Sequence, residues 1–213
     1  MTQAKTAAGT DVSPVAGPGQ DAPAKTPPKA SPRERLLDAA AELLSREGVH
    51  VSTDALCRAA GISKRSMYQF FSSKDEIIAT SLAQRAPAIT ALLLPEDGTA
   101  ASPREQMLHV FRRLEEIAPS PDFHGCPFLS AMVELKDTDH PACLIAQRQK
   151  TEMTAFFRGQ AERGGAADPT LLARQLSLVY DGAAARAGAG IEELDGLSLT
   201  TAAALIDAAG VRR

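Results

Sequence analysis

Side chains suited to contacting DNA are concentrated in residues 51–74, which read VSTDALCRAAGISKRSMYQFFSSK. Cations and hydroxyl groups bind phosphates, whereas amides, guanidinium groups and rings recognise base edges and the thymine methyl group. The second half of this stretch presents all of these groups together. Its candidates are Lys64, Arg65, Ser66, Tyr68, Gln69 and Phe70. We therefore interpret the stretch as a surface that can enter the major groove.

Two short helices joined by a glycine turn would position these side chains. We expect them over residues 53–60 and 64–71, with Gly61 adopting the positive φ that lets the second helix leave at a steep angle. Met67 and Phe71 are four residues apart and face inward, so the other side chains of that helix point outward. This arrangement is a helix-turn-helix motif. The same pattern also occurs as plain packing in helical proteins, and periodicity alone leaves both interpretations open.

The charge of the chain is distributed unevenly. Its formal net charge is −3 over 213 residues, which excludes a protein that is basic over its whole surface. Residues 51–74 nevertheless carry a net charge of +3, whereas residues 86–213 carry −5. A locally basic element on an otherwise acidic molecule indicates that one face is directed at DNA.

The composition, together with the helical spacing of apolar residues and the capping signals along the chain, predicts an all-α fold of about nine helices and no strand. Apolar residues make up 44% of the chain and aromatic residues only 4%, and alanine dominates, which favours closely packed helices. The first helix is expected to begin after Ser31, with Pro32 at its first position and Glu34 completing a capping box. We expect it to end at Gly48 in a left-handed conformation.

Capping residues and prolines predict six further helices after the motif. One spans residue 74 to about residue 94, opened by a capping box of Ser73 and Glu76 and kinked near Pro87. Another begins at residues 102–105 and ends before Pro119. We expect the others at 127–135, at 140–164, from 168 through 183, and from a cap at Ser198 through 206.

Nothing in the sequence indicates membrane insertion or export. No stretch approaches the roughly 18 uninterrupted apolar residues that a membrane span requires, and residues 1–30 lack the apolar core of a secretory signal. Residues 1–30 are instead rich in proline and are expected to form a disordered arm. We therefore expect a cytoplasmic protein that has no membrane partner.

A set of residues in the first part of the chain matches a known pattern. The set comprises a helix ending in Gly48, then Ser52-Thr53, Ala60-Gly61-Ile62-Ser63-Lys64, Met67-Tyr68, and Phe71 followed by Ser73-Lys74. With these residues the chain resembles the TetR/AcrR family of transcriptional regulators. The resemblance implies a DNA-binding domain over residues 31–76, whose second motif helix enters the major groove.

The resemblance also implies a role for each candidate residue. It places Lys64, Arg65 and Gln69 at base edges and Phe70 beside a base or sugar. Phosphate contacts are implied for Ser52, Thr53, Ser66, Tyr68 and Lys74. Arg65 departs from the family, which often has a small residue there, and we expect it to contact guanine through a bidentate fork. Thr53 departs as well, because an apolar residue is more usual, and a second hydroxyl at the helix cap is an equally good interpretation.

Residues 77–213 resemble the helical effector-binding and dimerisation domain of the same family, with weaker motifs. The resemblance implies that the last two helices pair with those of a second copy to form a homodimer. Small residues over 183–189 and 202–209 allow backbones to approach closely, although alanine is also simply a good helix former. We expect a small, mostly apolar effector in a pocket formed by Phe111, Cys126, Phe128, Met132 and Phe156.

A separate group of histidine and cysteine residues is suited to metal or redox chemistry. His124, Cys126, His140 and Cys143 provide four nitrogen and sulfur ligands for a zinc-like ion. However, a following proline restrains the first pair, His140 stands where a helix begins, and lone cysteines are commonly buried small hydrophobes. We expect no metal, no cofactor and reduced thiols. A thiol at Cys126 or Cys143 that senses oxidants or electrophiles stays open as an alternative.

No catalytic set accompanies these motifs: the sequence has no glycine-rich phosphate loop, no His-Glu metal pair on a helix and no nucleophile elbow. We therefore expect a DNA-binding regulator and not an enzyme. The most specific expectation is a homodimeric repressor that binds a palindromic double-stranded operator and releases it on binding a small molecule. Alternatively, the chain is a helical small-molecule-binding or thiol-sensing module without specific DNA binding.

Overall fold

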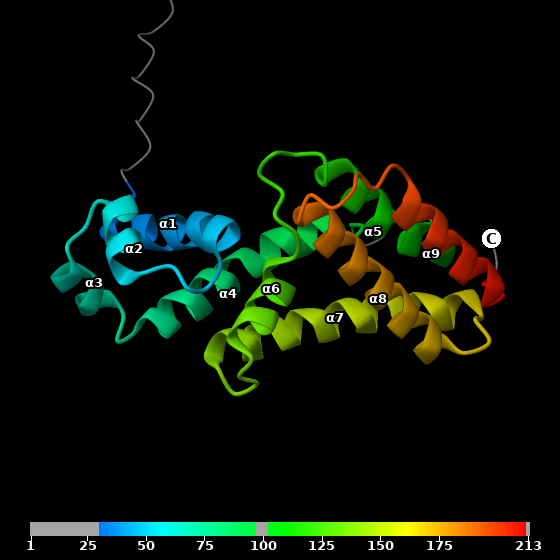
Figure 1. The fold of residues 1–213 in the computed structure, drawn as a ribbon. Helices are drawn as coiled ribbons and strands as arrows, with labels where there is room; N and C mark the ends of the chain where they lie inside the picture. The colour runs from blue at the N-terminus through cyan, green and yellow to red at the C-terminus, as the bar shows by residue number, and fades with distance from the viewer. Residues whose placement is uncertain (1–29, 97–101, 212–213) are drawn as a thin grey trace, which may run out of the picture.

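The computed structural model describes residues 30–96 and 102–211, and these residues form nine α-helices and no strand (Figure 1). The all-α prediction is therefore confirmed. The helices are α1 (Pro32–Glu47), α2 (Thr53–Ala60), α3 (Lys64–Phe70), α4 (Lys74–Leu93), α5 (Pro103–Ile117), α6 (Pro127–Leu135), α7 (Pro141–Gly164), α8 (Pro169–Gly188) and α9 (Leu197–Ala208). The arm expected over residues 1–30 lies outside the described part of the chain, apart from Ala30. None of the described helices is both long and apolar enough to cross a membrane.

Helices α1 to α3 and the start of α4 enclose one cluster of buried apolar side chains. Its fully buried members include Leu36, Ala40, Leu56, Met67 and Ile77. The start of α1 confirms the predicted capping box, since the Ser31 hydroxyl accepts the Glu34 N–H and the Glu34 carboxylate accepts the Ser31 N–H. Because Met67 is buried in this cluster, α3 is held against α1 and α2.

A second cluster of buried apolar side chains lies among α4 to α9. The longest helix, α7, packs against α4, α5, α6 and α8, and α9 packs against α5 and α8. Within this cluster the rings of Phe111 and Phe157 stack with their centroids 5.9 Å apart. Figure 1 shows α3 and α9 at opposite ends of the molecule, with α4 running from one unit into the other. Ile77 and Ile78 of α4 are buried in different clusters, so this helix is shared by both units.

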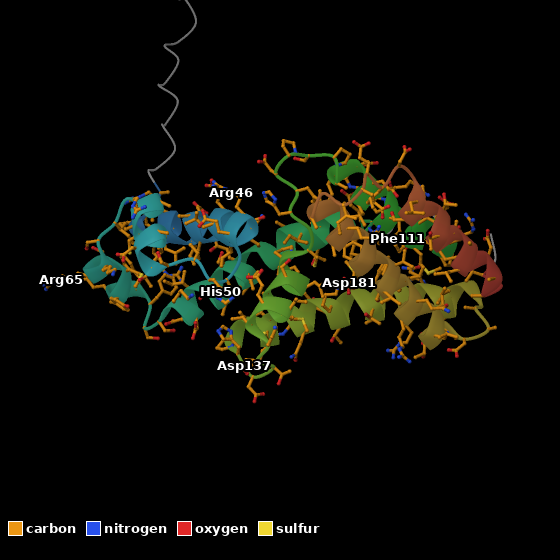
Figure 2. All side chains as sticks on the ribbon, in the orientation of Figure 1. Arg46, His50, Arg65, Phe111, Asp137 and Asp181 are labelled. Carbon is orange, nitrogen blue, oxygen red and sulfur yellow. The ribbon has the colours of Figure 1, made fainter. Side chains whose placement is uncertain are left out.

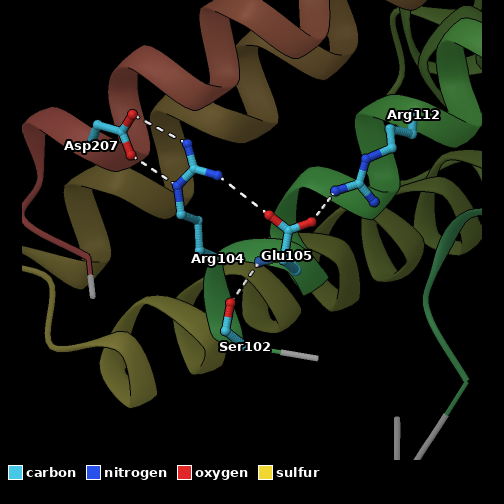
Figure 3. Close-up of polar contacts among 5 residues, drawn as sticks. All are labelled: Ser102, Arg104, Glu105, Arg112 and Asp207. Atoms are coloured by element: carbon cyan, nitrogen blue, oxygen red, sulfur yellow. Dashed lines mark hydrogen bonds and ion pairs between the residues drawn. The ribbon is translucent and has the colours of Figure 1, made fainter. Parts of the chain in front are cut away.

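Charged side chains join the start of α5 to the end of α9 (Figure 3). The Arg104 guanidinium donates to both carboxylate oxygens of Asp207, at 2.9 and 3.2 Å, and lies 3.4 Å from the Glu105 carboxylate. Glu105 pairs in turn with Arg112. Ser102 caps α5, as predicted, by accepting the Glu105 N–H. Since the Arg104 fork pairs with both oxygens of Asp207, it fixes the orientation of α9 on α5.

The start of α9 differs from the sequence prediction. The predicted cap, Ser198, lies inside the helix, which begins at Leu197. The Glu115 carboxylate of α5 accepts hydrogen bonds from the Ser198 hydroxyl at 2.6 Å and from the backbone N–H groups of Gly196, Ser198 and Leu199 at 2.9, 3.0 and 3.3 Å. Burial raises the pKa of Glu115, but these hydrogen bonds outweigh it and hold the pKa below its usual value. A distant carboxylate therefore replaces the local cap.

Two smaller differences concern helix ends. Gly48 has a positive φ of 76°, but its ψ of −170° is extended and not left-handed helical. A Cβ at Gly48 would collide with the Glu134 carboxylate of α6, which would have to move, and the positive φ itself favours glycine. At α4, Ser73 caps the helix as predicted, whereas the Glu76 carboxylate accepts hydrogen bonds from the N–H and hydroxyl of Ser72. The reciprocal bond of that capping box is thus shifted by one residue.

Candidate nucleic-acid interface

Short caps and one glycine orient α2 and α3. Ser52 accepts the Ala55 N–H at 3.1 Å at the start of α2, and Ser63 accepts the Ser66 N–H at 3.0 Å at the start of α3. Between the two helices Gly61 has φ 64° and ψ 39°, the left-handed conformation that the turn requires. The helix-turn-helix geometry predicted from the sequence is therefore present.

Helix α3 has one buried face and one exposed face. Met67 is fully buried and Phe71, directly after the helix, is 3% exposed, as their spacing predicts. By contrast, Tyr68 is 57% and Phe70 38% exposed. Figure 2 shows Arg65 at the tip of this end of the molecule, directed away from the protein. The other exposed candidates are Ser52, Lys64 and Gln69, while Thr53, Ser66 and Lys74 are half-buried.

Lys64 and Ser66 have partners on this face. The Lys64 ammonium lies 2.9 Å from the Asp54 carboxylate, and both side chains are exposed. The hydrogen bond to Asp54 raises the pKa of Lys64 above its usual value, so the side chain stays cationic. The Ser66 hydroxyl lies 3.0 Å from the Ser63 hydroxyl. Because exposed ion pairs are weak in water, a phosphate can compete with Asp54 for Lys64.

Three exposed polar side chains of α3 have no bonding partner in the described part of the protein. Within residues 30–96 and 102–211, Arg65, Tyr68 and Gln69 make no hydrogen bond or ion pair. Their donors and acceptors are therefore directed at solvent. A guanidinium, a phenol and an amide are thus exposed on one short helix, where they can contact another molecule.

The structure places Lys74 differently from the phosphate contact that the sequence predicts. Its ammonium donates to the carbonyl of Val49 at 2.9 Å and to that of Val51 at 3.4 Å, in the connection between α1 and α2. Lys74 thus holds the segment that leads to the Ser52 cap. Thr53 is half-buried and its hydroxyl makes no hydrogen bond with any described residue, so it is not the second capping group considered from the sequence.

Two arginines in the first turn of α1 support the interface and are missing from the sequence prediction. The Arg33 guanidinium lies 5.1 Å from the centroid of the Phe71 ring. Arg35 donates to the Ala60 carbonyl at 3.1 Å and so holds the end of α2. Cations are unfavourable in the first turn of a helix because the helix dipole is positive there. Two arginines in this unfavourable position are the sequence feature that indicates tertiary contacts for both side chains.

The second helical unit contacts this interface through α6 and the start of α7. The Glu134 carboxylate accepts the Val49 N–H at 2.7 Å. His140 Nε2 lies 3.4 Å from the Asp75 carboxylate at the start of α4. The other ring nitrogen of His140 accepts the Ala142 N–H at 3.0 Å and caps α7, which is the ordinary use expected for a histidine at a helix start. Polar contacts therefore join the two units beside the α1–α2 connection.

A cleft in the second unit lies among α4, α6, α7 and α8 and encloses about 930 Å³, part of it open to solvent. Of the predicted effector-site residues, Cys126 and Phe128 line this cleft. Phe111, Met132 and Phe156 do not line it. Phe111 is fully buried in a stacked aromatic pair, and Met132 and Phe156 are half-buried and pack against the core. Their apolar size predicts burial, but it does not distinguish core from cavity wall.

The cysteines are placed for packing. Cys57, Cys126 and Cys143 are all buried and unpaired. Burial raises the pKa of Cys126 and of Cys143 above the usual value, which disfavours the reactive thiolate. Among the described residues, no three His, Cys, Asp or Glu side chains gather where they could hold a metal ion. The four-ligand cluster considered from the sequence is thus not assembled there.

Comparisons with known proteins agree with this geometry. Residues 36–80 match the sequence model of a family described as bacterial regulatory proteins, tetR family. The crystal structure of a TetR-type transcriptional regulator from Streptomyces avermitilis is 55% identical, covers 86% of this chain and 100% of its own, and superposes with a TM-score of 0.83. A TetR-family transcriptional regulator from Streptomyces coelicolor is 26% identical, with 84% and 95% of the two chains covered and a TM-score of 0.76. The HTH-type transcriptional regulator YjdC of Escherichia coli is 25% identical over 159 residues, 72% of this chain and 82% of its own.

The family match covers a short part of the chain, whereas the structural likeness covers most of it. The match to the family includes α2 and α3, where the exposed polar face lies. The likeness to the Streptomyces avermitilis protein, at 55% identity, extends through the second unit as well. The chain therefore belongs to the TetR family of bacterial regulatory proteins and is a DNA-binding regulator of transcription.

Proposed function

We propose that α3 of this regulator enters the major groove of its operator and reads the bases there. The observation that carries the proposal is that Lys64, Arg65 and Gln69 are exposed together on a helix anchored by buried Met67. These three side chains would contact base edges, with Phe70 beside a base or sugar. A guanidinium without an internal partner, as in Arg65, suits the paired acceptors of guanine.

Phosphate contacts are proposed for the hydroxyl groups that surround the base-reading set. These hydroxyls belong to Ser52, Thr53, Ser66 and Tyr68. Contacts to phosphates fix the register and orientation of the protein on the duplex without reading sequence. Lys74 is left out of this set because its ammonium supports the α1–α2 connection.

The second unit, over residues 77–213, is proposed to form a homodimer through α8 and α9, and residues 31–76 to form the DNA-binding domain. Leu171 and Leu178 lie about two turns apart on α8 and are 48% and 74% exposed, and Leu197 of α9 is 53% exposed. Large exposed leucines on neighbouring helices indicate an interaction surface. Pairing through this surface would hold two α3 helices at the fixed separation that a palindromic operator requires.

A small molecule in the cleft is proposed to release the operator, which makes the protein a repressor acting in the cytoplasm. Cys126 and Phe128, at the start of α6, line the cleft, and Glu134 near its end holds Val49. A shift of the cleft end of α6 would therefore reach the segment before α2. A coupling free energy of about 1–3 kcal/mol is enough to change operator occupancy several-fold.

The test is a gel shift with the DNA upstream of the protein's own gene, run at two salt concentrations beside an unrelated duplex of equal length. We expect specific binding that declines steeply as salt increases. Arg65→Ala should lose the preference, whereas Arg148→Ala, at an exposed arginine of α7, is the matched control and should keep it. Equal binding of both duplexes by the wild-type protein would contradict the proposal and favour a helical module without specific DNA binding.

A further inference from the structure

Tyr180 of α8 brings an unpartnered hydroxyl to the cleft among α4, α6, α7 and α8. Its side chain is 4% exposed, and the hydroxyl makes no hydrogen bond with any residue that the structure describes. Tyr180 lines the cleft, where its hydroxyl is the polar group that the side chain offers to a ligand. A ligand that supplies an acceptor here relieves an unsatisfied donor.

The charges next to Tyr180 are already balanced. The Lys150 ammonium of α7 lies 5.0 Å from the centroid of the Tyr180 ring and pairs with the Asp181 carboxylate. The side chains of this ion pair are only 17% and 23% exposed. The other charged side chains that line the cleft are Arg85, Asp122 and Glu152. With Asp181 included, acidic groups outnumber basic ones, so the lining is net negative, although the Arg85 guanidinium has no carboxylate partner and donates to the Ala41 carbonyl at 3.0 Å.

This charge balance disfavours an anionic ligand. An anion would leave water for a lining in which acidic groups outnumber basic ones and the Lys150 ammonium beside Tyr180 is already paired, and burying such a charge is costly. Burial also raises the pKa of Tyr180 well above its usual value, so the hydroxyl remains a donor through the neutral range. A protonated donor beside a neutralised ion pair therefore suits an uncharged acceptor.

The rest of the lining is mostly apolar. Its larger apolar side chains are Ile89, Leu93, Ile117, Phe123, Phe128 and Met153. A mostly apolar lining with few polar groups is typical of sites that bind small organic molecules. Burial of an apolar ligand surface would supply most of the binding free energy, and a single polar contact would orient the ligand.

We propose that this cleft binds an uncharged, largely apolar molecule whose oxygen acceptor, such as a ketone, receives a hydrogen bond from the Tyr180 hydroxyl. The Lys150–Asp181 pair acts as a charge filter, because Asp181 neutralises the cation that lies beside Tyr180 and that an anionic ligand would need there. This inference rests on the ligand-responsive function proposed above and adds the chemical class of the effector.

Three naphthalenes of similar shape test this proposal. 2-Acetylnaphthalene carries an uncharged acceptor, 2-isopropylnaphthalene carries none, and 2-naphthoate is an anion. The chain contains no tryptophan, so naphthalene fluorescence reports binding to the full-length protein directly. We expect the ketone to bind about fivefold more tightly than either of the others. Equal or tighter binding of 2-naphthoate, or no binding of the ketone, would overturn the proposal.

Two substitutions test the roles assigned to the polar side chains. Tyr180→Phe should weaken ketone binding about fivefold and leave the affinity for 2-isopropylnaphthalene unchanged, since only the hydroxyl is removed. Asp181→Asn should release the Lys150 charge and increase the affinity for 2-naphthoate. A ketone preference that survives Tyr180→Phe would contradict the hydrogen bond, and an unchanged 2-naphthoate affinity in Asp181→Asn would contradict the charge filter. If either variant fails to fold in a thermal unfolding control, the three-probe comparison in the wild-type protein still decides.

Titration with operator DNA separates a wrong ligand class from a wrong function. If the protein binds its operator specifically but binds none of the probes, the proposed ligand class is wrong and the proposed function stands. Absence of specific operator binding contradicts the proposed function, whichever probe binds. Release of the operator by saturating ketone, and not by 2-isopropylnaphthalene, supports both.

Discussion

The Glu134 carboxylate, near the end of α6, accepts a hydrogen bond of 2.7 Å from the backbone N–H of Val49, in the connection between α1 and α2. The two residues are 85 positions apart and belong to different helical units. They meet beside Gly48, whose missing side chain leaves room for the carboxylate. Because the other end of α6 lines the cleft, one helix contacts both the cleft and the segment that precedes the DNA-facing helices.

A double-mutant cycle tests this contact. Gly48→Ala should lower the free energy of unfolding by roughly 1–3 kcal/mol, because alanine is strained at this torsion and its Cβ displaces the Glu134 carboxylate. Glu134→Ala removes one charge-assisted hydrogen bond and should cost about 1–3 kcal/mol. In urea unfolding the double variant should lose less than the sum, because the collision is gone. Additive losses would show that Gly48 does not make room for the carboxylate.

The salt dependence of operator binding distinguishes Lys64 from Lys74. Lys64 is exposed on α3 and would bring its cation close to the phosphates that flank the base edges, so Lys64→Met should reduce the slope of log affinity against log salt by about 1. Lys74 is occupied by the Val49 and Val51 carbonyls, so Lys74→Met should lower thermal stability and leave the slope unchanged. A reduced slope for Lys74→Met would restore the phosphate contact that the sequence suggested.

Glu115 makes the start of α9 sensitive to acid. Its pKa in the folded protein lies below the usual value, so its stabilising effect is present above the unfolded pKa and is lost as the pH falls through the folded pKa. Glu115→Gln should cost about 1–3 kcal/mol at neutral pH, and the difference from wild type should shrink in acid. Urea unfolding at several pH values measures it. Glu116→Gln, at an exposed neighbour, is the control, and a pH-independent cost for Glu115→Gln would contradict this account.

Leu178 tests the proposed dimer surface. Leu178→Glu places a charge at a leucine that is 74% exposed, so the subunit itself should keep its stability while the dimer dissociates. Sedimentation velocity at micromolar concentration measures the outcome. Val133→Glu, at a valine of α6 that is 61% exposed, should remain dimeric. A dimer that persists in Leu178→Glu would mean that α8 pairs elsewhere or not at all.

Features set by neighbouring residues were predictable from the sequence. The Ser31 and Glu34 capping box spans three positions, and Met67 and Phe71 follow the helical period that places them inside. The exposed face of α3 follows from the same period. Because such patterns depend on residues within one or two turns, the sequence alone specifies them.

Features set by distant contacts were not predictable in this way. Glu115 replaces the expected Ser198 cap although it lies 83 positions away, and Lys74 reaches a carbonyl 25 positions away. The sequence prediction places Phe111 in the effector pocket, yet its ring is stacked in the core. A tyrosine on a helix carries no local sign of facing a cleft, so the place of Tyr180 in the lining follows only from the structure. Each case depends on which helices meet, and no short-range pattern contains that information.

The most direct test of the central claim, that the exposed face of α3 reads the operator, measures binding to every single-base-pair variant of one half-site. Arg65→Ala should weaken specific binding by about 1–3 kcal/mol and relax the preference at one position. Tyr68→Phe should weaken binding about evenly across all variants, because a phosphate contact carries no base information. Full sequence preference in Arg65→Ala, or a loss confined to one base pair in Tyr68→Phe, would contradict the assignment of this face as the reading surface.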